Sequence, residues 1–381
     1  MTTVPTDAAL ARLLDQFRSG KPAALARAVS IVENHRAGFE QVLAAQHALL
    51  GRARRIGITG PPGAGKSTLT TRLARYYRSL DLRVGIVAVD PTSPFTGGAL
   101  LGDRIRMEEI ALDPGVFIRS MATRGSLGGL ATATREVCDV LDGFGMDVII
   151  IETVGVGQSE LDVARAADST LVVLVPESGD SIQTLKAGVM EIADVYTVNK
   201  ADRPGADRLR NDIELMLGLR AGAALQNVPA HHGVDLRAAP DRDALRDAMN
   251  PARAARAAAR AEAPEQWTPP VLRSVAAQNE GIEDIAQSLD RHFRYLEQSG
   301  ELRIRRRARL RERVMEVVEQ QVRQRLWQDA ATLAWLDAQL DGLEEGTLVP
   351  FAVADTLRAR STALLTGASF APLPSTSGIS A

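Results

Sequence analysis

The sequence predicts an α/β fold in which helices flank a mainly parallel sheet, and three features of the chain support this. Short apolar runs alternate with stretches of helical periodicity from residue 54 to about residue 200, as in consecutive strand–helix units. The runs are apolar at nearly every position, which is typical of strands covered on both faces. A glycine-rich segment follows the first run, where parallel folds place a phosphate-binding loop.

The expected strands are apolar runs, and they cover 54–59, 84–89, 116–118, 148–151, 171–175, 195–198 and 271–276. Residues 1–49 precede them as a helical extension with two amphipathic helices. The α/β domain is expected at 50–298, with an insertion of short helices and loops at 221–263. A C-terminal helical segment follows at 299–366, and the tail at 367–381 is expected to be disordered.

The C-terminal segment contains a predicted helix at 302–326 with one apolar face. That face is formed by Leu310, Val314, Val317, Val318, Val322 and Leu326. Because the stripe lies outside the main core, it is a candidate subunit contact, and we expect a homodimer.

Composition excludes several classes of protein. A net charge of -2 gives the chain no general attraction to nucleic acid or to anionic membranes. No apolar run approaches the ~18 residues of a membrane helix, and the first residues lack the pattern of a secretory signal. The lone Cys138 excludes an intrachain disulfide and suits a reducing compartment. We therefore predict a cytoplasmic protein.

The glycine-rich segment matches the G-x-x-x-x-G-K-[ST] phosphate loop at every specified position. It runs Gly60-Pro61-Pro62-Gly63-Ala64-Gly65-Lys66-Ser67, and Thr68 follows. Backbone N–H groups of such a loop point at phosphate oxygens, Lys66 reaches the β- and γ-phosphates, and the Ser67 hydroxyl can hold Mg²⁺. The segment predicts binding of a nucleoside triphosphate in a P-loop NTPase fold.

A second motif, Asn199-Lys200-Ala201-Asp202, directly follows the strand predicted at 195–198. A carboxylate at Asp202 can accept from both N1–H and N2–H₂ of guanine, a pair of donors that adenine lacks. Two such bonds, at roughly 1.5–3 kcal/mol each, give about 10² to 10⁴ of discrimination. Asn199 is expected to hold the phosphate loop and the base, and the Lys200 stem to lie along the ring. GTP is therefore the favoured ligand.

Acidic residues follow two of the predicted strands. Glu152 opens the segment that continues to Gly155, where a phosphate-loop protein places an acid near the metal and a glycine on the γ-phosphate. Asp90 ends another strand at the same edge of the sheet, where ligands bind in open α/β folds. Since hard oxygens suit Mg²⁺, Ser67, Asp90 and Glu152 are the predicted metal ligands. For either acid taken alone, a capping or turn role remains the alternative.

Six ordered motifs resemble the MeaB/ArgK family of GTPases. They are Gly60 to Thr68, Val89 to Pro94, Leu101 to Met107, Arg124 to Gly129, Glu152 to Gln158 and Asn199 to Asp202. The resemblance runs from about Leu25 to Arg220 and resumes from Trp267 to about Leu357. Members of this family act as chaperones of adenosylcobalamin-dependent methylmalonyl-CoA mutase.

The resemblance implies roles for individual residues. Lys66, Asp103 and Glu152 would be catalytic, with Asp90 completing the corner that fixes metal and water, while Asp202 would bind guanine. Three further residues match a mobile loop that carries the GTPase state to the mutase in the family, and they are Asp180, Gln183 and Lys186. Without the resemblance, that loop is equally well explained as a helix start capped by Asp180.

The chain departs from the family pattern in two places. Val275-Ala276-Ala277 follows Ser274 where relatives commonly have Ser-Ala, so a backbone contact to guanine O6 is expected without a serine hydroxyl. The insertion at 221–263 is longer than the family leads us to expect. It is expected to alter a partner-facing surface and to leave the nucleotide site unchanged.

The motifs predict an Mg²⁺-dependent GTPase, and the family resemblance implies that it gates cofactor loading and protects an adenosylcobalamin-dependent acyl-CoA mutase. One alternative is a metallochaperone NTPase, which the scattered histidines and lone cysteine disfavour. Another is a P-loop kinase or transport ATPase, which Asp202 disfavours. An internal arginine finger among Arg104, Arg106 and Arg124 is left open.

A basic run near the C-terminus is a weaker signal. It consists of Arg303, Arg305, Arg306, Arg307, Arg309, Arg311 and Arg313. No aromatic residues interleave with it, so we expect a solvated helix face and no nucleic-acid site.

Overall fold

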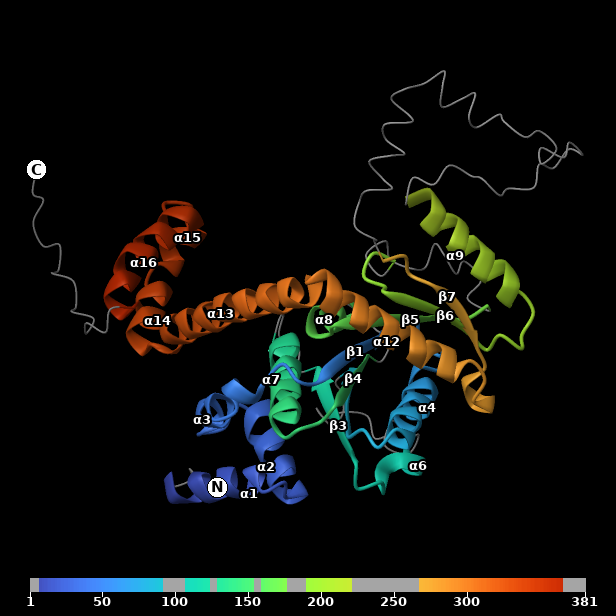
Figure 1. The fold of residues 1–381 in the computed structure, drawn as a ribbon. Helices are drawn as coiled ribbons and strands as arrows, with labels where there is room; N and C mark the ends of the chain where they lie inside the picture. Colours follow the sequence, from blue (N-terminus) through green and yellow to red (C-terminus); the bar gives the residue numbers. More distant parts are fainter. Residues whose placement is uncertain are drawn as a thin grey trace, which may run out of the picture. The chain divides into compact units, whose positions relative to one another are not determined.

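The computed structural model describes residues 7–91, 107–123, 129–153, 159–176, 190–220 and 267–365. Within these ranges one sheet of seven strands has the order β3-β2-β4-β1-β5-β6-β7 (Figure 1). The strands are β1 (Arg54–Thr59), β2 (Val84–Pro91), β3 (Val116–Thr123), β4 (Val148–Thr153), β5 (Ser169–Leu174), β6 (Val195–Asn199) and β7 (Val271–Ser274). All their pairings are parallel, so the predicted α/β fold is confirmed.

Helices cover both faces of the sheet, and the strand sequences show why. Along β4, Val148 and Ile150 pack with the α4 side, whereas Ile149 and Ile151 pack with the α7 side, and all four side chains are buried. One face carries α4 (Lys66–Ser79), α6 (Glu108–Ala111) and α12 (Ile282–Ser299). The other carries α7 (Gly129–Gly143) and α8 (Ser159–Ala166), and α9 (Ala206–Arg220) packs on β6 and β7. A strand covered in this way is apolar at successive positions.

The N-terminal extension lies against α7. The two predicted amphipathic helices are α1 (Asp7–Arg18) and α2 (Pro22–Glu33), and the structure adds α3 (Phe39–Ala44) and η1 (His47–Leu49). Buried residues of α2, among them Ala28, Val29 and Val32, join the same apolar cluster as Val137 and Leu141 of α7. The extension therefore shares its core with the sheet domain.

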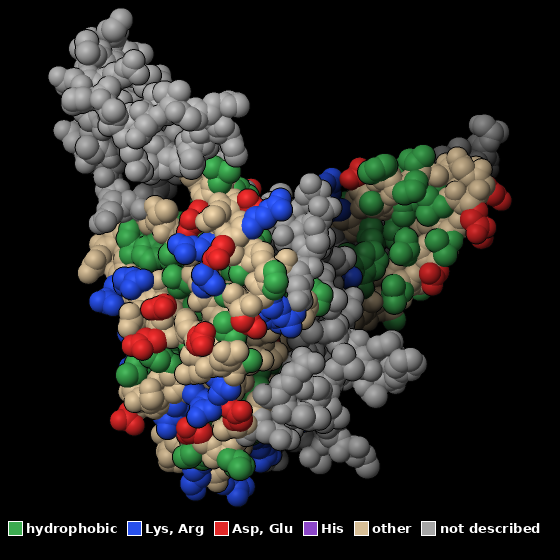
Figure 2. Space-filling view, turned by 90° about the vertical axis from the view of Figure 1, so that its right-hand side faces the viewer, with side chains coloured by type: hydrophobic (Ala, Val, Ile, Leu, Met, Phe, Trp, Pro, Cys, Tyr) green, Lys and Arg blue, Asp and Glu red, His purple; other side chains and the backbone are tan. Residues whose placement is uncertain are grey.

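The chain divides into two compact units, Met1–Arg306 and Arg307–Ala381. Most of α13 (Glu301–Gln328), which confirms the helix predicted at 302–326, belongs to the second unit with α14 (Ala330–Asp337), α15 (Leu340–Glu344) and α16 (Pro350–Leu365). This unit exposes large hydrophobic side chains. In the view of Figure 2, hydrophobic side chains gather on the visible face of the C-terminal helices. The insertion at 221–263 and the tail at 367–381 lie outside the described residues. No described helix combines the length and apolarity that crossing a membrane requires.

Two arginines of the basic run differ from the solvated face that we expected. Arg305 Nη1 lies 3.1 Å from Asp194 Oδ1, and Arg306 Nη2 lies 2.8 Å from Asp168 Oδ2. The Asp168 side chain is fully buried, so its ion pair is not a surface contact. Because Asp168 and Asp194 directly precede β5 and β6, the two pairs bind the second turn of α13, which still belongs to the first unit, to the amino ends of these strands. Arg307 is exposed, as expected for the run.

Candidate nucleotide site

The predicted phosphate loop fills the turn between the end of β1 and the start of α4, at the carboxyl edge of the sheet. Two of its glycines occupy positions where a side chain has no room. A Cβ atom at Gly60 would lie 2.1 Å from the Val173 carbonyl oxygen, and one at Gly65 would lie 2.5 Å from Asn199 Nδ2. Both residues also have positive φ angles, 139° and 86°, that favour glycine. The loop backbone is thus packed tightly against β5 and against the end of β6.

Two side chains at the start of α4 are held close to this loop. Lys66 is buried, and its Nζ donates to the carbonyl oxygens of Gly60 and Pro61, each at 2.9 Å. The Ser67 hydroxyl donates to Glu152 Oε1 at 2.6 Å. The structure therefore brings together a cation, a hydroxyl and a carboxylate that the sequence placed in the same site.

Glu152 reaches the site because β4 lies beside β1. It pairs in register with Ile58 of β1 and with Ala88 of β2, and it is 1% exposed. Asp90 stands two residues beyond Ala88, and its backbone pairs with Ala122 of β3. The Asp90 side chain is not among those that the structure describes. Two of the three predicted metal ligands, Ser67 and Glu152, are thus in contact.

Asn199, the last residue of β6, joins the phosphate loop to the predicted base loops. Its Nδ2 donates to the Ala64 carbonyl at 2.8 Å, and its Oδ1 accepts from the Ala276 amide at 3.0 Å. Oδ1 also lies 3.2 Å from the Ser274 hydroxyl, which in turn lies 2.9 Å from Thr197 Oγ1. All these groups are buried, where a satisfied polar network fixes one arrangement of the loops. The expected role of Asn199 toward the phosphate loop has a direct geometric basis.

The two base loops also contact each other through their backbones. The Ala201 amide donates to the Ser274 carbonyl at 3.1 Å, so the loop after β6 lies beside the loop after β7. Lys200 adopts a left-handed backbone conformation with φ 55°, and Asp202 is exposed. Val275 and Ala276 are buried, whereas Ala277 is exposed. Asp202 and Ala277 are thus two exposed residues of adjoining loops, as binding of a purine edge requires.

Several predicted residues lie outside the described ranges. They are Asp103, Gly155, Asp180, Gln183, Lys186 and the three arginines considered as a finger, Arg104, Arg106 and Arg124. Their proposed roles stay predictions.

The sequence missed two supporting residues. We expected no serine hydroxyl to contact guanine from the last base loop. The hydroxyl of Ser274 instead donates to Asn199 Oδ1, which also binds the Ala276 amide of that loop. Arg72 of α4 also contacts the loop, because its Nε donates to the Ala276 carbonyl at 3.3 Å. Nothing in the sequence distinguishes Arg72 from Arg75 or Arg78 on the same helix, so only the tertiary structure identifies it.

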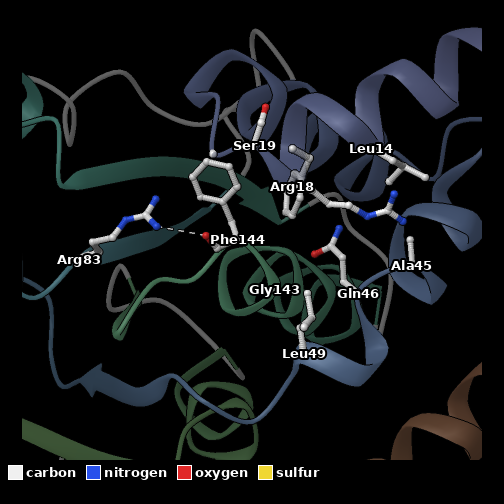
Figure 3. A pocket seen from close by; sticks show the side chains of 11 residues that line it. Leu14, Arg18, Ser19, Ala45, Gln46, Leu49, Arg83, Gly143 and Phe144 are labelled. Carbon is white, nitrogen blue, oxygen red and sulfur yellow. Dashed lines mark hydrogen bonds between the residues drawn. The ribbon is translucent and has the colours of Figure 1, made fainter.

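A cavity of about 420 Å³ lies near the amino ends of the strands, away from the phosphate loop (Figure 3). It is bounded by the N-terminal helices, by Arg83 directly before β2, by Gly143 at the end of α7 and by Phe144 after it. The guanidinium of Arg83 already stacks over the Phe144 ring at 5.0 Å and donates to the Phe144 carbonyl at 3.2 Å. This cavity is therefore separate from the nucleotide site, which lies at the carboxyl edge.

The family model described as methylmalonyl Co-A mutase-associated GTPase MeaB matches residues 25–331. The chain belongs to the MeaB family. This confirms the resemblance, and the MeaB-family chain is a GTP hydrolase that converts GTP and water to GDP and phosphate. A putative GTPase of Pyrococcus abyssi is 44% identical over 306 residues, which cover 80% of this chain and 83% of that protein.

Two other similarities bear on this MeaB-family GTPase. A mouse protein named methylmalonic aciduria type A homolog, mitochondrial, is 38% identical over 205 residues, which cover 50% of this chain and 49% of the mouse protein. The crystal structure of a LAO/AO transport system kinase superposes with a TM-score of 0.61 at 25% identity. It covers 94% of this chain and 99% of that chain, in agreement with the P-loop NTPase fold.

Proposed function

We propose that this GTPase is a Mg²⁺-dependent, homodimeric chaperone of an adenosylcobalamin-dependent acyl-CoA mutase. The observation that supports the nucleotide assignment is the link through Asn199, which joins the phosphate loop to the loop carrying Asp202 and to the loop after β7. The mutase assignment is supported by the description of the family and by the name of the mouse relative. Methylmalonyl-CoA mutase is the proposed partner, and the cytoplasm is the proposed location.

In the proposed reaction, water attacks the γ-phosphate in line, while Lys66 and the amides of the phosphate loop stabilise the charge that develops. Lys66 Nζ contacts two neutral carbonyl oxygens, those of Gly60 and Pro61. A phosphate oxygen carries negative charge and forms a stronger hydrogen bond with an ammonium group than a carbonyl does. The lysine can therefore exchange loop carbonyls for phosphate when the nucleotide binds.

The donors beside Lys66 fit Mg²⁺. Ser67 Oγ and Glu152 Oε1 are hard oxygens 2.6 Å apart, and hard oxygens are the ligands that this ion prefers. We propose that Ser67, Glu152 and Asp90 hold the ion, directly or through water, and that Asp90, Asp103 and Glu152 fix the attacking water. When bound, Mg²⁺ neutralises charge on the β- and γ-phosphates.

The homodimer proposal rests on the apolar side chains of α13. Leu310, Val314 and Val318 recur four residues apart, and each is more than half exposed. Burying a valine side chain stabilises an assembly by roughly 1.5–3 kcal/mol, so a row of such residues favours association. Contiguous exposed apolar surface of this kind is typical of protein–protein contacts.

The experiment that tests the function is a comparison of GTP hydrolysis with and without candidate cobalamin-dependent mutases. We expect slow hydrolysis by the protein alone and faster hydrolysis with its mutase, because a partner can order mobile loops. Lys66→Ala should lower the rate about 10²-fold or more in both conditions, since one donor to the developing charge is lost. Hydrolysis by Lys66→Ala at the wild-type rate would refute the active-site assignment. Failure of every mutase to bind or to change the rate would refute the partner assignment only.

A nucleotide-dependent kinase is the second candidate, because the superposed crystal structure is named a transport system kinase. Such an enzyme acting with ATP should bind adenine, whose edge lacks the two donors that a carboxylate at Asp202 accepts. A titration with GTP and ATP tests the choice of base. Comparable affinities for both nucleotides would contradict the guanine assignment at Asp202.

A further inference from the structure

The peptide groups on both sides of Ala276 are held by side chains from two other elements. Asn199 at the end of β6 accepts from the Ala276 amide at 3.0 Å, and Arg72 of α4 donates from Nε to the Ala276 carbonyl at 3.3 Å. The Asn279 amide donates to the same carbonyl at 3.3 Å, within the loop itself. Ala276 is 2% exposed. The backbone N–H and C=O of Ala276 are thus both held by hydrogen bonds, so the position of the residue does not depend on its small side chain.

The loop around Ala276 is also closed on itself, and of the amides at 275–280 only that of Ala277 has no acceptor among the described residues. The Val275 amide donates to the Glu280 carbonyl at 3.1 Å, and the Ala276 amide is bound to Asn199. Of the three residues assigned to guanine O6, Ala277 is the exposed one. The Ala277 amide is therefore the donor that fits a base carbonyl.

Arg72 connects this loop to the helix that begins with the phosphate-binding residues. Lys66 and Ser67 open α4, and Arg72 lies on the same helix. The Arg72 side chain is one-fifth exposed, and its Nη1 also contacts Glu109 Oε2 of α6 at 3.2 Å. Arg75 contacts the same Glu109 oxygen at 2.9 Å and has no bond to Ala276. Arg72 thus differs from Arg75 in one contact, the carbonyl of Ala276.

We propose that Arg72 is a positioning residue for guanine recognition. Together with the Asn279 amide, it fixes the Ala276 carbonyl, and so orients the peptide group between Ala276 and Ala277, whose N–H donates to guanine O6. This inference rests on the proposed nucleotide site and adds a residue to it. Arg72 acts through the backbone of the loop and does not touch the base.

The test compares affinities for GDP and for 6-thio-GDP, measured by calorimetric titration of the full chain. The thio analogue keeps the N1–H and N2–H₂ groups that face Asp202 and replaces O6 with sulfur, a weaker acceptor. We expect the wild-type protein to prefer GDP. Arg72→Ala should weaken GDP binding about fivefold, the equivalent of one hydrogen bond of ~1 kcal/mol, and should bring the GDP to 6-thio-GDP affinity ratio toward one.

Two further variants separate this role from a general structural one. Arg72→Lys keeps a cation for Glu109 but lacks the Nε donor, so it should lower the ratio as Arg72→Ala does, even if the alanine variant is poorly folded. Arg75→Ala removes only a contact to Glu109 and should leave both affinities at wild-type values. Thermal melting of each variant reports whether it is folded.

Three results would overturn the proposal. They are a wild-type ratio in both Arg72 variants, an equal loss of affinity for both nucleotides, and a loss in Arg75→Ala as large as in Arg72→Ala. Failure of the underlying site assignment would look different, because the wild-type protein itself would then fail to distinguish GDP from ADP.

Discussion

Asn199 shows how one buried amide can join two functions of a nucleotide site. Its nitrogen donates to the phosphate loop, and its oxygen accepts from the loop after β7. The nitrogen lies 2.5 Å from where a Cβ atom of residue 65 would be, too close for a real contact, so Gly65 is required by packing as well as by its positive φ. Gly63 has a similar φ of 74°, but open space surrounds it.

This contrast gives a prediction for the nucleotide-free protein. Both Gly65→Ala and Gly63→Ala place a side chain at positive φ, which costs roughly 1–2 kcal/mol. Gly65→Ala must in addition displace Asn199 from Ala64, and loss of a buried hydrogen bond costs about 1–3 kcal/mol more. Urea unfolding should therefore rank Gly65→Ala below Gly63→Ala in free energy of unfolding. Equal stabilities would show that Asn199 does not pack against residue 65.

Asp202 is the residue on which the choice of base depends. It is exposed in the loop after β6, and its side chain makes no hydrogen bond or ion pair to the residues that the structure describes. Asp202→Asn replaces an acceptor of two N–H groups with a group that also donates, which suits the 2-oxo group of xanthine. We expect the affinity for GDP to fall about 10²- to 10⁴-fold and the affinity for xanthosine diphosphate (XDP) to rise.

The matched control is Asp207→Asn, which removes the same charge nearby. Asp207 is exposed and pairs with Arg273 at 2.8 Å, outside the predicted base contacts. Asp207→Asn should leave the preference for GDP over XDP unchanged. Unaltered base preference in Asp202→Asn would refute the guanine assignment.

At the scale of elements, parallel strands bring side chains together from distant positions. Ser67 and Glu152 are 85 residues apart, yet they touch because β4 lies beside β1 and both strands end at the same edge. The sequence predicted this meeting, since the carboxyl ends of buried parallel strands converge. It also predicted each strand of the sheet from its apolar run, although β3 continues to Thr123, where we expected 118, and β7 ends at Ser274, where we expected 276.

Contacts made by single charged residues could not be predicted in this way. Arg305 and Arg306 stand in a run of arginines that looks uniformly solvated, and Arg72 stands among similar residues of α4. Each meets its partner only after elements more than a hundred residues apart have packed. Helical periodicity indicates which face of a helix is apolar, but it does not identify which charged side chain binds a buried carboxylate or carbonyl of another element.

The end of α4 carries an ion pair whose strength should depend on pH. Arg78 Nε lies 3.0 Å from both oxygens of Asp113, and the Gly115 amide donates to the same carboxylate at 2.7 Å. The bond from Arg78 holds the pKa of Asp113 below its ordinary value. A lowered pKa means that the folded state favours the carboxylate. The stabilisation is therefore complete above the unfolded pKa of about 3.9 and disappears as the pH falls through the folded pKa.

Asp113→Asn should accordingly lower the free energy of unfolding by about 1 kcal/mol near neutral pH and by little in strong acid. The figure is small for an ion pair because solvent screens this partly exposed carboxylate. Urea unfolding of wild type and variant across this range measures the difference. Asp81→Asn in the turn after α4 is the control, because Asp81 is exposed and makes no side-chain bond to the described residues. A difference that stays constant with pH would refute the role of the Asp113 carboxylate.

At the scale of the whole molecule, the two units divide the expected tasks. The residues of the proposed nucleotide site that the structure describes belong to Met1–Arg306, whereas the exposed apolar row of α13 belongs to Arg307–Ala381. If the row is a subunit contact, association and GTP binding should be separable by mutation. The double substitution Val314→Glu with Val318→Glu tests this, because Val314 is 64% and Val318 is 52% exposed.

We expect size-exclusion chromatography with light scattering to find wild type as a dimer and this double variant as a monomer. Two buried carboxylates at a contact are costly unless they are paired, while glutamate is a good helix former and should leave α13 intact. The control, Gln321→Glu with Gln324→Glu, adds the same charge at exposed polar positions of the same helix and should remain dimeric. A monomeric wild type, or a dimeric valine variant, would refute the contact. Retained GDP binding by the monomer would show that each subunit carries a complete nucleotide site, because the mutated residues lie outside the phosphate and base loops.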